Sequence, residues 1–501
     1  MTAAPSAAEL AHDDVRVRSV RELLGSSHAR LALGVLLLEF STGVSVYATA
    51  VVVPSVIAQF HAADRYPLVL SATGVGMFLA LALATRVLIR FGPAIVLATG
   101  LALTIGGAGL SALAGSALVF AMGRFGAAVG SGLLGVFGTS AVIATVPQGY
   151  RTRLLAMTSA MWIIPGLLGP SLAVLAVQAV GWRFTLLLVV PLVVLARVLL
   201  GRACIDAVRQ SQRTDPTDRR VAPKGAVGRR RLVLSLLLPA GMAAFTFGSA
   251  TSFGTWALLG LVVAAVGAVE LLPTGTIRAA AGPPRYLALL ALVAFGFFGA
   301  DGLLTTIATR ADGVALIWVT VSLGAAAVAW SLASLIQPRL AGRRGERAEN
   351  VLRAGLLVMA TSTAGVVGLE AFGRADGIAV FACWSAAGVG MGLAYPAMYL
   401  RAITAPGEEA GAHTVAAATL ATAVMVAEST GARFGTAAGG AIVDVTQRLG
   451  HAEATGLHAA MAAFAGALAL AAGVAVIGGP GTSRRRRPSF SAGRTSQPGG
   501  R

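Results

Sequence analysis

The sequence predicts an all-α membrane protein with about fourteen transmembrane helices, and three observations support this interpretation. Only 12% of the 501 residues are charged, whereas a soluble globular domain carries about 25% charged residues. Hydrophobic residues make up 56% of the chain, and the mean hydropathy is +0.79. The apolar residues form successive runs of about 20 residues, which is the length that a helix needs to cross a bilayer. The 62 glycines suit the close helix–helix approach found in membranes.

The strong positive charge is better explained by membrane topology than by nucleic-acid binding. The formal net charge is +18, and a chain this basic can neutralise nucleic-acid phosphates. Its arginines, however, lie in short loops between the apolar runs, where they would set the orientation of the helices. We therefore expect no nucleic-acid partner.

Each apolar run supplies one expected helix. The first run follows a tail that contains Glu9, Asp13 and Asp14, which is not a secretory signal. The seventh and eighth runs are short and meet at residues 248–254, so they could instead form one re-entrant pair. The expected spans are 31–59, 66–89, 94–114, 117–143, 154–179, 184–200, 232–250, 255–272, 286–309, 314–337, 352–372, 377–400, 412–444 and 457–479.

Alternation of these spans from a cytoplasmic N-terminus places both termini in the cytoplasm. Most of the 39 Lys and Arg residues then lie on the cytoplasmic side, as the positive-inside rule requires. A miscounted span in the middle would invert the downstream half and destroy this pattern, so an even number of spans is expected. The outer side receives only Arg65, Arg183, Arg310, Arg374 and Arg448.

The spans form two groups of six, with two extra central helices between the groups. The C-terminal tail is rich in Gly, Ser, Pro and Arg and is expected to be disordered. Its Arg484–Arg487 run suits contact with anionic lipid. The expected divisions are a cytoplasmic N-tail (1–30), an N-terminal six-helix bundle (31–200), a basic cytoplasmic loop (201–231), two extra helices (232–272), a C-terminal six-helix bundle (286–479) and the tail (480–501).

Two glycine-rich spans carry motifs that resemble a known family. Arg124 lies near the start of one span, where an arginine is costly and should face a cavity or a partner. Gly166, Gly169 and Pro170 follow in the next span. This set resembles the major facilitator superfamily, and most closely its fourteen-spanner drug–proton antiporter branch. The Arg124 span resembles that family's fourth-helix signature, and residues 166–170 resemble its antiporter signature.

Two basic loops occupy corresponding positions in the two halves. In the loop after the second span, Arg90 and Gly92 match the superfamily's loop signature, and Ile89 stands in place of its acidic residue. In the second half, Gly342 stands at the position of the acid. Two such loops form an internal repeat, as this fold requires. The matching residues of the second loop are Arg343, Gly345 and Arg347.

Five ionisable residues lie well inside the expected spans. Each costs at least about 2.5–3.5 kcal/mol at the centre of a bilayer, so residues of this kind usually line a water-filled path. We therefore expect them to form a proton-coupling or substrate cavity. They are Glu39, Arg124, Asp301, Glu428 and Arg433.

Most of these residues have both a functional and a structural interpretation. Glu39 could accept a proton or contact a cation, or it could bridge to Arg124 or to a backbone group. Arg124 could orient a proton-carrying acid, as the resemblance implies, or form a fixed salt bridge. The aspartate usual in the family's first helix falls on Ser45. Asp301 could contact substrate or a proton, or cap a helix broken near residues 299–302.

The expected spans 377–400 and 412–444 raise questions of packing. Glu428 and Arg433 lie about 140° apart around a helix, so they should not pair with each other. The GxxxGxxxG pattern at 431–439 indicates a tight interhelical seam. The glycines at 388–392 suggest a flexible span, in which Tyr395 and its neighbours could touch substrate or pack in the core.

The motifs narrow the possible functions. The sequence has no GxxxxGK[ST] loop, no Ser/His/Asp set and no metal-ligand spacing. We therefore expect no enzyme activity, no cofactor and no metal site.

The resemblance implies a proton-coupled exporter of amphiphilic, drug-like molecules that works by alternating access in the cell membrane. Its partners would be the small-molecule substrate, protons and the bilayer, and we expect a monomer. The alternatives are an uptake symporter for a metabolite and a membrane sensor that does not transport.

Overall fold

The structure is a computed structural model in which every regular element of the described residues is a helix. The described residues are 20–26, 28–62, 65–161, 163–214, 229–250, 254–342, 345–371, 376–404 and 414–477.

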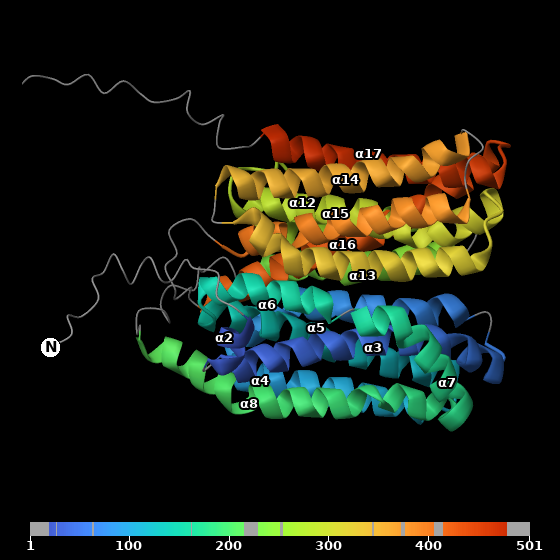
Figure 1. Ribbon diagram of the computed structural model, residues 1–501. Coiled ribbons are helices and arrows are strands. Elements are labelled where there is room, and N and C mark those ends of the chain that lie inside the picture. Colours follow the sequence, from blue (N-terminus) through green and yellow to red (C-terminus); the bar gives the residue numbers. More distant parts are fainter. Residues whose placement is uncertain are drawn as a thin grey trace, which may run out of the picture.

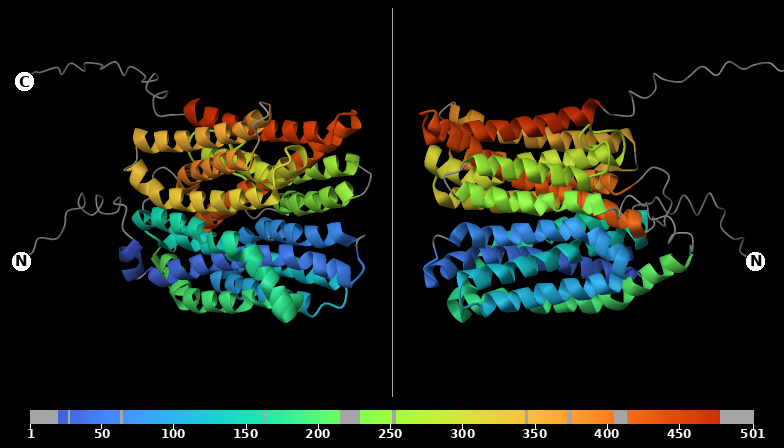
Figure 2. Two further views of the ribbon diagram at one scale, coloured as in Figure 1. Left: turned by 45° about the vertical axis from the view of Figure 1, so that its right-hand side comes forward. Right: turned by 180° about the vertical axis from the view of Figure 1, so that it is seen from behind.

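Two helical bundles lie side by side as two layers, in which the long helices run in nearly the same direction (Figure 1). Figure 2 shows the same two layers from two other sides. The first bundle consists of α2 (Val20–Gly25), α3 (Ala29–Gln59), α4 (Tyr66–Ala112), α5 (Ala117–Thr145), α6 (Gln148–Ala160), α7 (Ile163–Leu187) and α8 (Val189–Thr214). The second consists of α12 (Pro283–Thr306), the short π-helix η2 (Ile307–Ala311), α13 (Leu316–Ala341), α14 (Glu346–Ala371), α15 (Gly377–Ala402), α16 (Thr414–Arg448) and α17 (Glu453–Ile477).

Two glycines turn the chain back within helices of the first bundle. Gly92 interrupts α4 with φ 81° and ψ 170°, and Gly181 interrupts α7 with φ 79° and ψ 160°. This backbone conformation is essentially restricted to glycine. Pro93 follows Gly92 as the first residue of the second arm of α4, where a missing N–H costs nothing. The two arms of α4 correspond to the expected spans 66–89 and 94–114.

The two extra helices form a hairpin between the bundles. It consists of the short α9 (Arg229–Ser235), α10 (Leu237–Ala250) and α11 (Gly254–Leu271). Glycines bring α10 and α11 together, since a Cβ on Gly241 would collide with the backbone of α11 and one on Gly267 with the backbone of α10. α10 packs against α4, and α11 packs against α16 (Figure 2). The hairpin therefore contacts both bundles.

Glycines also set the packing inside the second bundle. The expected seam at 431–439 is confirmed, because a Cβ on Gly431 or Gly435 would collide with the carbonyl groups of Ala291 and Phe295 on α12. The glycines at 388–392 behave differently from expectation. They lie against the backbones of neighbouring helices, and α15 is continuous, so they serve close packing and not flexibility.

The helix α8 extends beyond the expected sixth span. The basic loop was expected to begin at residue 201, and α8 continues into it as far as Thr214. The segment from 202 to 215 contains no glycine or proline, so no residue in it breaks the helix. The remainder of that loop, up to residue 228, lies outside the described residues.

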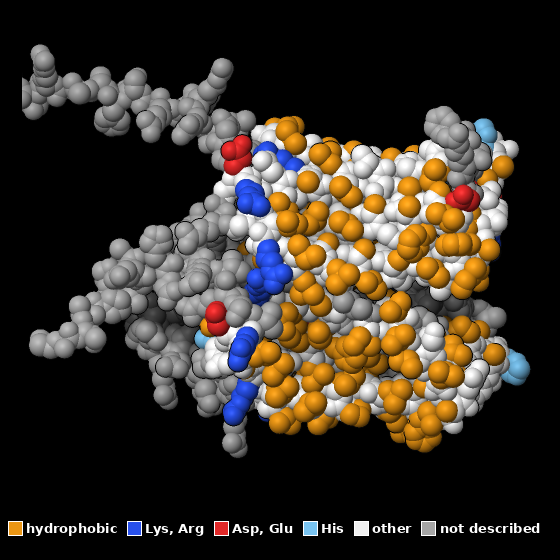
Figure 3. Space-filling model, viewed as in Figure 1, with side chains coloured by type: hydrophobic (Ala, Val, Ile, Leu, Met, Phe, Trp, Pro, Cys, Tyr) orange, Lys and Arg blue, Asp and Glu red, His pale blue; other side chains and the backbone are white. Residues whose placement is uncertain are grey.

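Basic side chains gather at one end of the molecule, and hydrophobic side chains cover the rest of the visible face (Figure 3). Contacts at this end join residues that the predicted alternation places on the same side. The Arg285 guanidinium donates to the carbonyl oxygens of Val474 and Ala475, at 2.9 and 2.7 Å. Arg401 pairs with Glu349 at 3.4 Å.

At the opposite end, contacts also join residues that the predicted alternation places on the same side. The Arg183 guanidinium donates to the carbonyl oxygens of Ala112 and Ala114, at 2.9 and 2.8 Å. His458 lies 3.2 Å from Asp312. All of these residues are predicted to lie at the outer surface.

Nine helical segments of the described chain are long and apolar enough to cross a membrane. The α11 segment Trp256–Leu271 is apolar but shorter. The chain is therefore a multi-pass helical protein, and the total of about fourteen crossings stays a prediction.

The turn at Gly92 can be tested by substitution. We expect Gly92→Ala to lower the free energy of unfolding by about 1–3 kcal/mol, because alanine is strained at this φ and ψ. Gly106→Ala is the matched control, since Gly106 lies on the second arm of α4 with open space around it and ordinary helical geometry. Thermal unfolding of the purified protein measures both. Equal midpoints for the two variants would contradict this role for Gly92.

Candidate functional site

The charged residues that the sequence places inside the spans lie on helices of both bundles. Glu39 is on α3 and Arg124 on α5, in the first bundle. Asp301 is on α12, whereas Glu428 and Arg433 are on α16, in the second bundle. Their neighbours show which of them face the boundary between the bundles.

Asp301 is held by a tryptophan from a neighbouring helix. The Trp384 indole N–H donates to Asp301 Oδ1 at 3.1 Å. Trp384 is fully buried and stacks on Phe297, with ring centroids 5.6 Å apart and planes at 14°. The helix α12 is continuous through Asp301, so the alternative in which this aspartate caps a broken helix is wrong.

A row of aromatic rings leads from Trp384 towards the other end of the second bundle. Phe297 packs edge-on against Trp330 at 6.0 Å, and Trp330 packs edge-on against Tyr395 at 5.7 Å. Tyr399 continues the row, 5.9 Å from Tyr395. Phe297 and Trp384 are buried, whereas Trp330, Tyr395 and Tyr399 are half-buried. The three half-buried rings combine apolar faces with an indole N–H and two hydroxyls, which suits contact with an aromatic or amphiphilic molecule.

The far end of this row meets acidic groups from both bundles. The Tyr395 side chain hydrogen-bonds with Glu428. Glu39 of the first bundle lies close enough to Tyr395 and Tyr399 to act on both electrostatically. Thr139 of α5 lies 3.5 Å from the Tyr399 hydroxyl. Glu39 and Glu428 thus approach one pair of tyrosines from opposite bundles.

Arg124 contacts the serine that replaces the family's aspartate. One guanidinium nitrogen lies 3.4 Å from Ser45 Oγ, and Arg124 is only 4% exposed. Its Nε has no hydrogen-bond partner in the described chain. Ser45, which stands at the position of the family's first-helix aspartate, therefore lies next to Arg124. It offers a hydroxyl in place of a carboxylate.

Arg433 reaches across the boundary between the bundles. Its guanidinium lies against Gly74 of α4, since a Cβ on that glycine would be 3.6 Å from the guanidinium carbon. No ion pair joins Arg433 to Glu428 among the contacts of the described chain, as their angular offset on α16 predicts. Arg433 is exposed, which is consistent with a position at an accessible boundary.

Two glycines of the antiporter-like signature lie against the side chain of Tyr47 on α3. A Cβ on Gly169 would lie 3.0–3.1 Å from Tyr47 side-chain atoms, whereas one on Gly166 would have ordinary contacts at 3.5 and 3.7 Å. Asp301 lies close enough to Tyr47 to act on it electrostatically. The signature thus positions a tyrosine that faces the aspartate of the other bundle. The side chain of Pro170 lies outside the described residues.

The loop-signature residues lie at the basic end. Arg90 is exposed beside the turn at Gly92. Gly345 has φ 151°, and Arg347 is exposed. Arg343 lies outside the described residues. The structure does not bring Arg90 or Arg347 to the charged residues inside the bundles.

The bundles also contact each other towards the basic end. Thr85 and Thr422 lie 2.7 Å apart, joining α4 to α16. Arg153 of α6 donates to the carbonyl oxygen of Leu335 on α13 at 3.5 Å. Burial and the nearby positive charge of Arg339 lower the pKa of Arg153. The positive charges of Arg153 and Arg339 therefore oppose each other at this contact.

Sequence reasoning missed several members of the site. Tyr47 and Thr139 carry no charge and match no motif, so nothing in their sequence context indicates a role. Trp330 lies on a different helix from Trp384, and only the contacts of both with Phe297 reveal the aromatic row. The described residues contain no cluster of His, Cys, Asp and Glu that could hold a metal ion.

Comparisons with known proteins identify the class. A family model of the Major Facilitator Superfamily matches residues 35–430. The chain therefore belongs to this superfamily, whose members are membrane transporters, and is a multi-pass transporter of small molecules.

Individual relatives agree with this assignment. Two Mycobacterium tuberculosis proteins, from strains CDC 1551 / Oshkosh and ATCC 25618 / H37Rv, are each named as a probable multidrug-efflux transporter. Each is 26% identical to this chain over 455 residues, which cover 85% of this chain and 91% of the relative.

Solved structures show the same fold. One is a bacterial homologue of the iron transporter ferroportin in an outward-facing state, with a TM-score of 0.63, 14% identity and coverage of 90% of this chain and 99% of that one. Another is the human organic anion transporter MFSD10, with a TM-score of 0.60, 14% identity and coverage of 91% and 100%.

The close contact between Gly169 and Tyr47 can be tested by substitution. We expect Gly169→Ala to reduce transport to less than about a third of wild type, because contacts of this length force Tyr47 to shift in a close-packed interior. Gly166→Ala, which meets only ordinary contacts, should retain most of the activity. Transport by reconstituted protein, normalised to folded protein, measures both. Lower transport by Gly166→Ala than by Gly169→Ala would contradict this role for Gly169.

Proposed function

We propose that this chain is a proton-coupled exporter of small amphiphilic molecules that works by alternating access in the cell membrane. The observation that carries the proposal is the approach of acids from both bundles to one aromatic row, with Asp301 at one end and Glu39 and Glu428 at the other. Buried acids of this kind mark proton pathways in transporters. A site between the two halves is where transporters of this architecture bind substrate.

The chemistry of coupling follows from charge. A deprotonated acid at the boundary between the bundles attracts water and cations and disfavours closure around it. Protonation removes that charge, so the bundles can close over a neutral site. A proton that enters from outside would in this way reset the site after substrate leaves. We also propose about fourteen crossings, cytoplasmic termini and a monomer.

Export, as opposed to uptake, is supported by two observations. Residues 166–170 resemble the antiporter signature, and Gly169 positions Tyr47 opposite Asp301. The relatives named as probable multidrug-efflux transporters match 85% of the chain. An amphiphilic substrate fits the aromatic row, which combines apolar rings with two tyrosine hydroxyls and an indole N–H.

Proton coupling can be measured in everted membrane vesicles that hold a fluorescent pH probe. Addition of ethidium should make protons leave the acidic lumen as the dye enters. Asp301→Asn and Glu428→Gln should each reduce this proton movement to less than about a tenth of wild type, because an amide cannot carry the proton. Glu39→Gln and Arg124→Ala should reduce it as well.

Glu453→Gln is the control, since Glu453 lies at the outer end of α17, paired with exposed Arg310 at 3.4 Å. This variant should behave as wild type. Proton movement in the same direction as the dye would identify a symporter. Unchanged proton movement in all four site variants would show that these residues do not couple transport.

Alternating access predicts that the contact between Thr85 and Thr422 opens during transport. In a background with Cys204 and Cys383 replaced by serine, Thr85→Cys/Thr422→Cys should cross-link with a short bifunctional thiol reagent. Cross-linking should lower ethidium transport by about tenfold or more, because it holds this end closed. A cleavable reagent should allow a reductant to restore transport. Full activity of the cross-linked protein would contradict the mechanism.

A further inference from the structure

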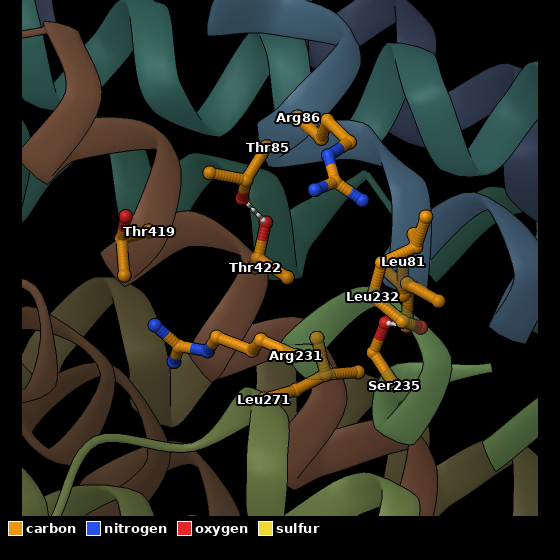
Figure 4. A pocket seen from close by; sticks show the side chains of 10 residues that line it. Leu81, Thr85, Arg86, Arg231, Leu232, Ser235, Leu271, Thr419 and Thr422 are labelled. Atoms are coloured by element: carbon orange, nitrogen blue, oxygen red, sulfur yellow. Dashed lines mark hydrogen bonds between the residues drawn. The ribbon is translucent and has the colours of Figure 1, made fainter. Parts of the chain in front are cut away.

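A small pocket lies where the extra hairpin meets both bundles (Figure 4). Its volume is about 50 Å³. Four helices line it: α4 of the first bundle, α16 of the second, and α9 and α11 of the hairpin. The transport cycle proposed above uses none of the charged residues in this pocket.

Two arginines from different parts of the fold face this pocket. Arg86 comes from α4 and Arg231 from α9, and both line the pocket. The Arg86 guanidinium points into the space beside Thr85 and Thr422, whereas the Arg231 side chain extends past Thr422 on the side of Thr419 (Figure 4). Arg231 also donates to the backbone carbonyl oxygen of Glu270 at 3.1 Å, and its Nε lies 3.9 Å from the Glu270 carboxylate. Arg231 and Glu270 therefore form an ion pair in which the carboxylate lies outside the pocket lining. The lining itself contains two cations and no acid.

Hydroxyl groups complete the polar side of the pocket. Thr85 and Thr422 share a hydrogen bond of 2.7 Å, and Thr419 and Ser235 are also in the lining. Arginines combined with hydroxyl groups are the donors that bind phosphate oxygens in proteins, because a guanidinium can offer two parallel N–H bonds to one phosphate.

The rest of the lining is apolar. Leu81, Leu232 and Leu271 stand beside the polar groups. Leu271 is the last residue of α11, and Arg231 is the third residue of α9, so the pocket lies near the helix ends at the basic end of the molecule. In the proposed topology this is the level of the cytoplasmic headgroups. Basic pockets between helices on that side suit lipid headgroups.

We propose that this pocket binds a phosphate group, supplied either by an anionic phospholipid of the cytoplasmic leaflet or by a soluble phosphate compound. The two arginines donate to the phosphate and neutralise it, and the leucines contact the adjoining carbon atoms. A bound phosphate would connect α9 to α4 and lie against α16. It would therefore stabilise the arrangement in which the bundles are in contact at this end.

The test measures the unfolding midpoint of the purified full-length protein in detergent. Phosphatidylglycerol, phosphatidylcholine and inorganic phosphate are added separately, over a range of concentrations. Phosphatidylglycerol should raise the midpoint of the wild type. Arg86→Gln and Arg231→Gln should each weaken this response by about tenfold in concentration, as the loss of a charge-assisted hydrogen bond predicts.

Two variants separate binding from a structural role. Arg230→Gln removes an exposed neighbour of Arg231 that is outside the pocket lining, and it should respond as wild type. Glu270→Gln removes the carboxylate near Arg231 but keeps the cation. If Arg231 served only to hold Glu270, both Arg231→Gln and Glu270→Gln would weaken the response. For a phosphate site, Glu270→Gln retains or strengthens it.

The outcomes distinguish the two sources. A response to phosphatidylglycerol with none to inorganic phosphate identifies a lipid, and the reverse identifies a soluble phosphate compound. Three results would overturn the proposal. They are no response of the wild type to phosphatidylglycerol or inorganic phosphate, a response of Arg86→Gln and Arg231→Gln equal to that of the wild type, and a loss in Arg230→Gln as large as that in Arg231→Gln. The measurement does not depend on transport, so it stands apart from a failure of the proposed exporter mechanism.

Discussion

Moving a charged side chain into hydrocarbon costs at least about 2.5–3.5 kcal/mol, and this chain carries five such groups well inside its expected spans. That cost constrains the whole arrangement. Asp301 accepts a hydrogen bond from a buried indole, and Glu428 bonds with a tyrosine. Arg433 lies on the opposite bundle's α4. Asp301, Glu428 and Arg433 are thus stabilised by polar or interfacial contacts, and none of the ion pairs found among the described residues includes them.

The remaining structure keeps these groups in place while leaving the bundles separable. Within each bundle, glycines allow backbones to touch, as at Gly431 and Gly435 against α12. Between the bundles the polar contacts are few and side-chain based, such as the threonine pair near the basic end. The positive charges of Arg153 and Arg339 oppose each other there. Rigid halves joined by a weak boundary are the mechanical requirement of a rocking transporter.

The sequence predicted the all-helical fold, because long apolar runs follow from local hydropathy, and the roles of the charged positions stay predictions. It placed Asp301 in a span, but the hydrogen bond from Trp384 joins residues 83 positions apart and has no local signal. The contact between Tyr47 and Gly169 likewise has no local signal in the sequence. The glycines at 388–392 were misinterpreted as flexible, since sequence alone does not show which backbone lies against them. The helix α8 extends beyond the expected sixth span, because hydropathy marks where an apolar run stops and not where the helix stops.

The central claim is that the two bundles move against each other and that protonation biases this motion. Spin labels at exposed Phe91 and Leu340 report on the basic end, and labels at exposed Arg65 and Arg448 report on the opposite end. Pulsed electron–electron distance measurements on the reconstituted protein, repeated across pH, test the claim directly. The account predicts two distance populations at each end, which shift in opposite senses with pH and stop shifting in Asp301→Asn/Glu428→Gln. A single pH-independent distance at both ends would contradict it.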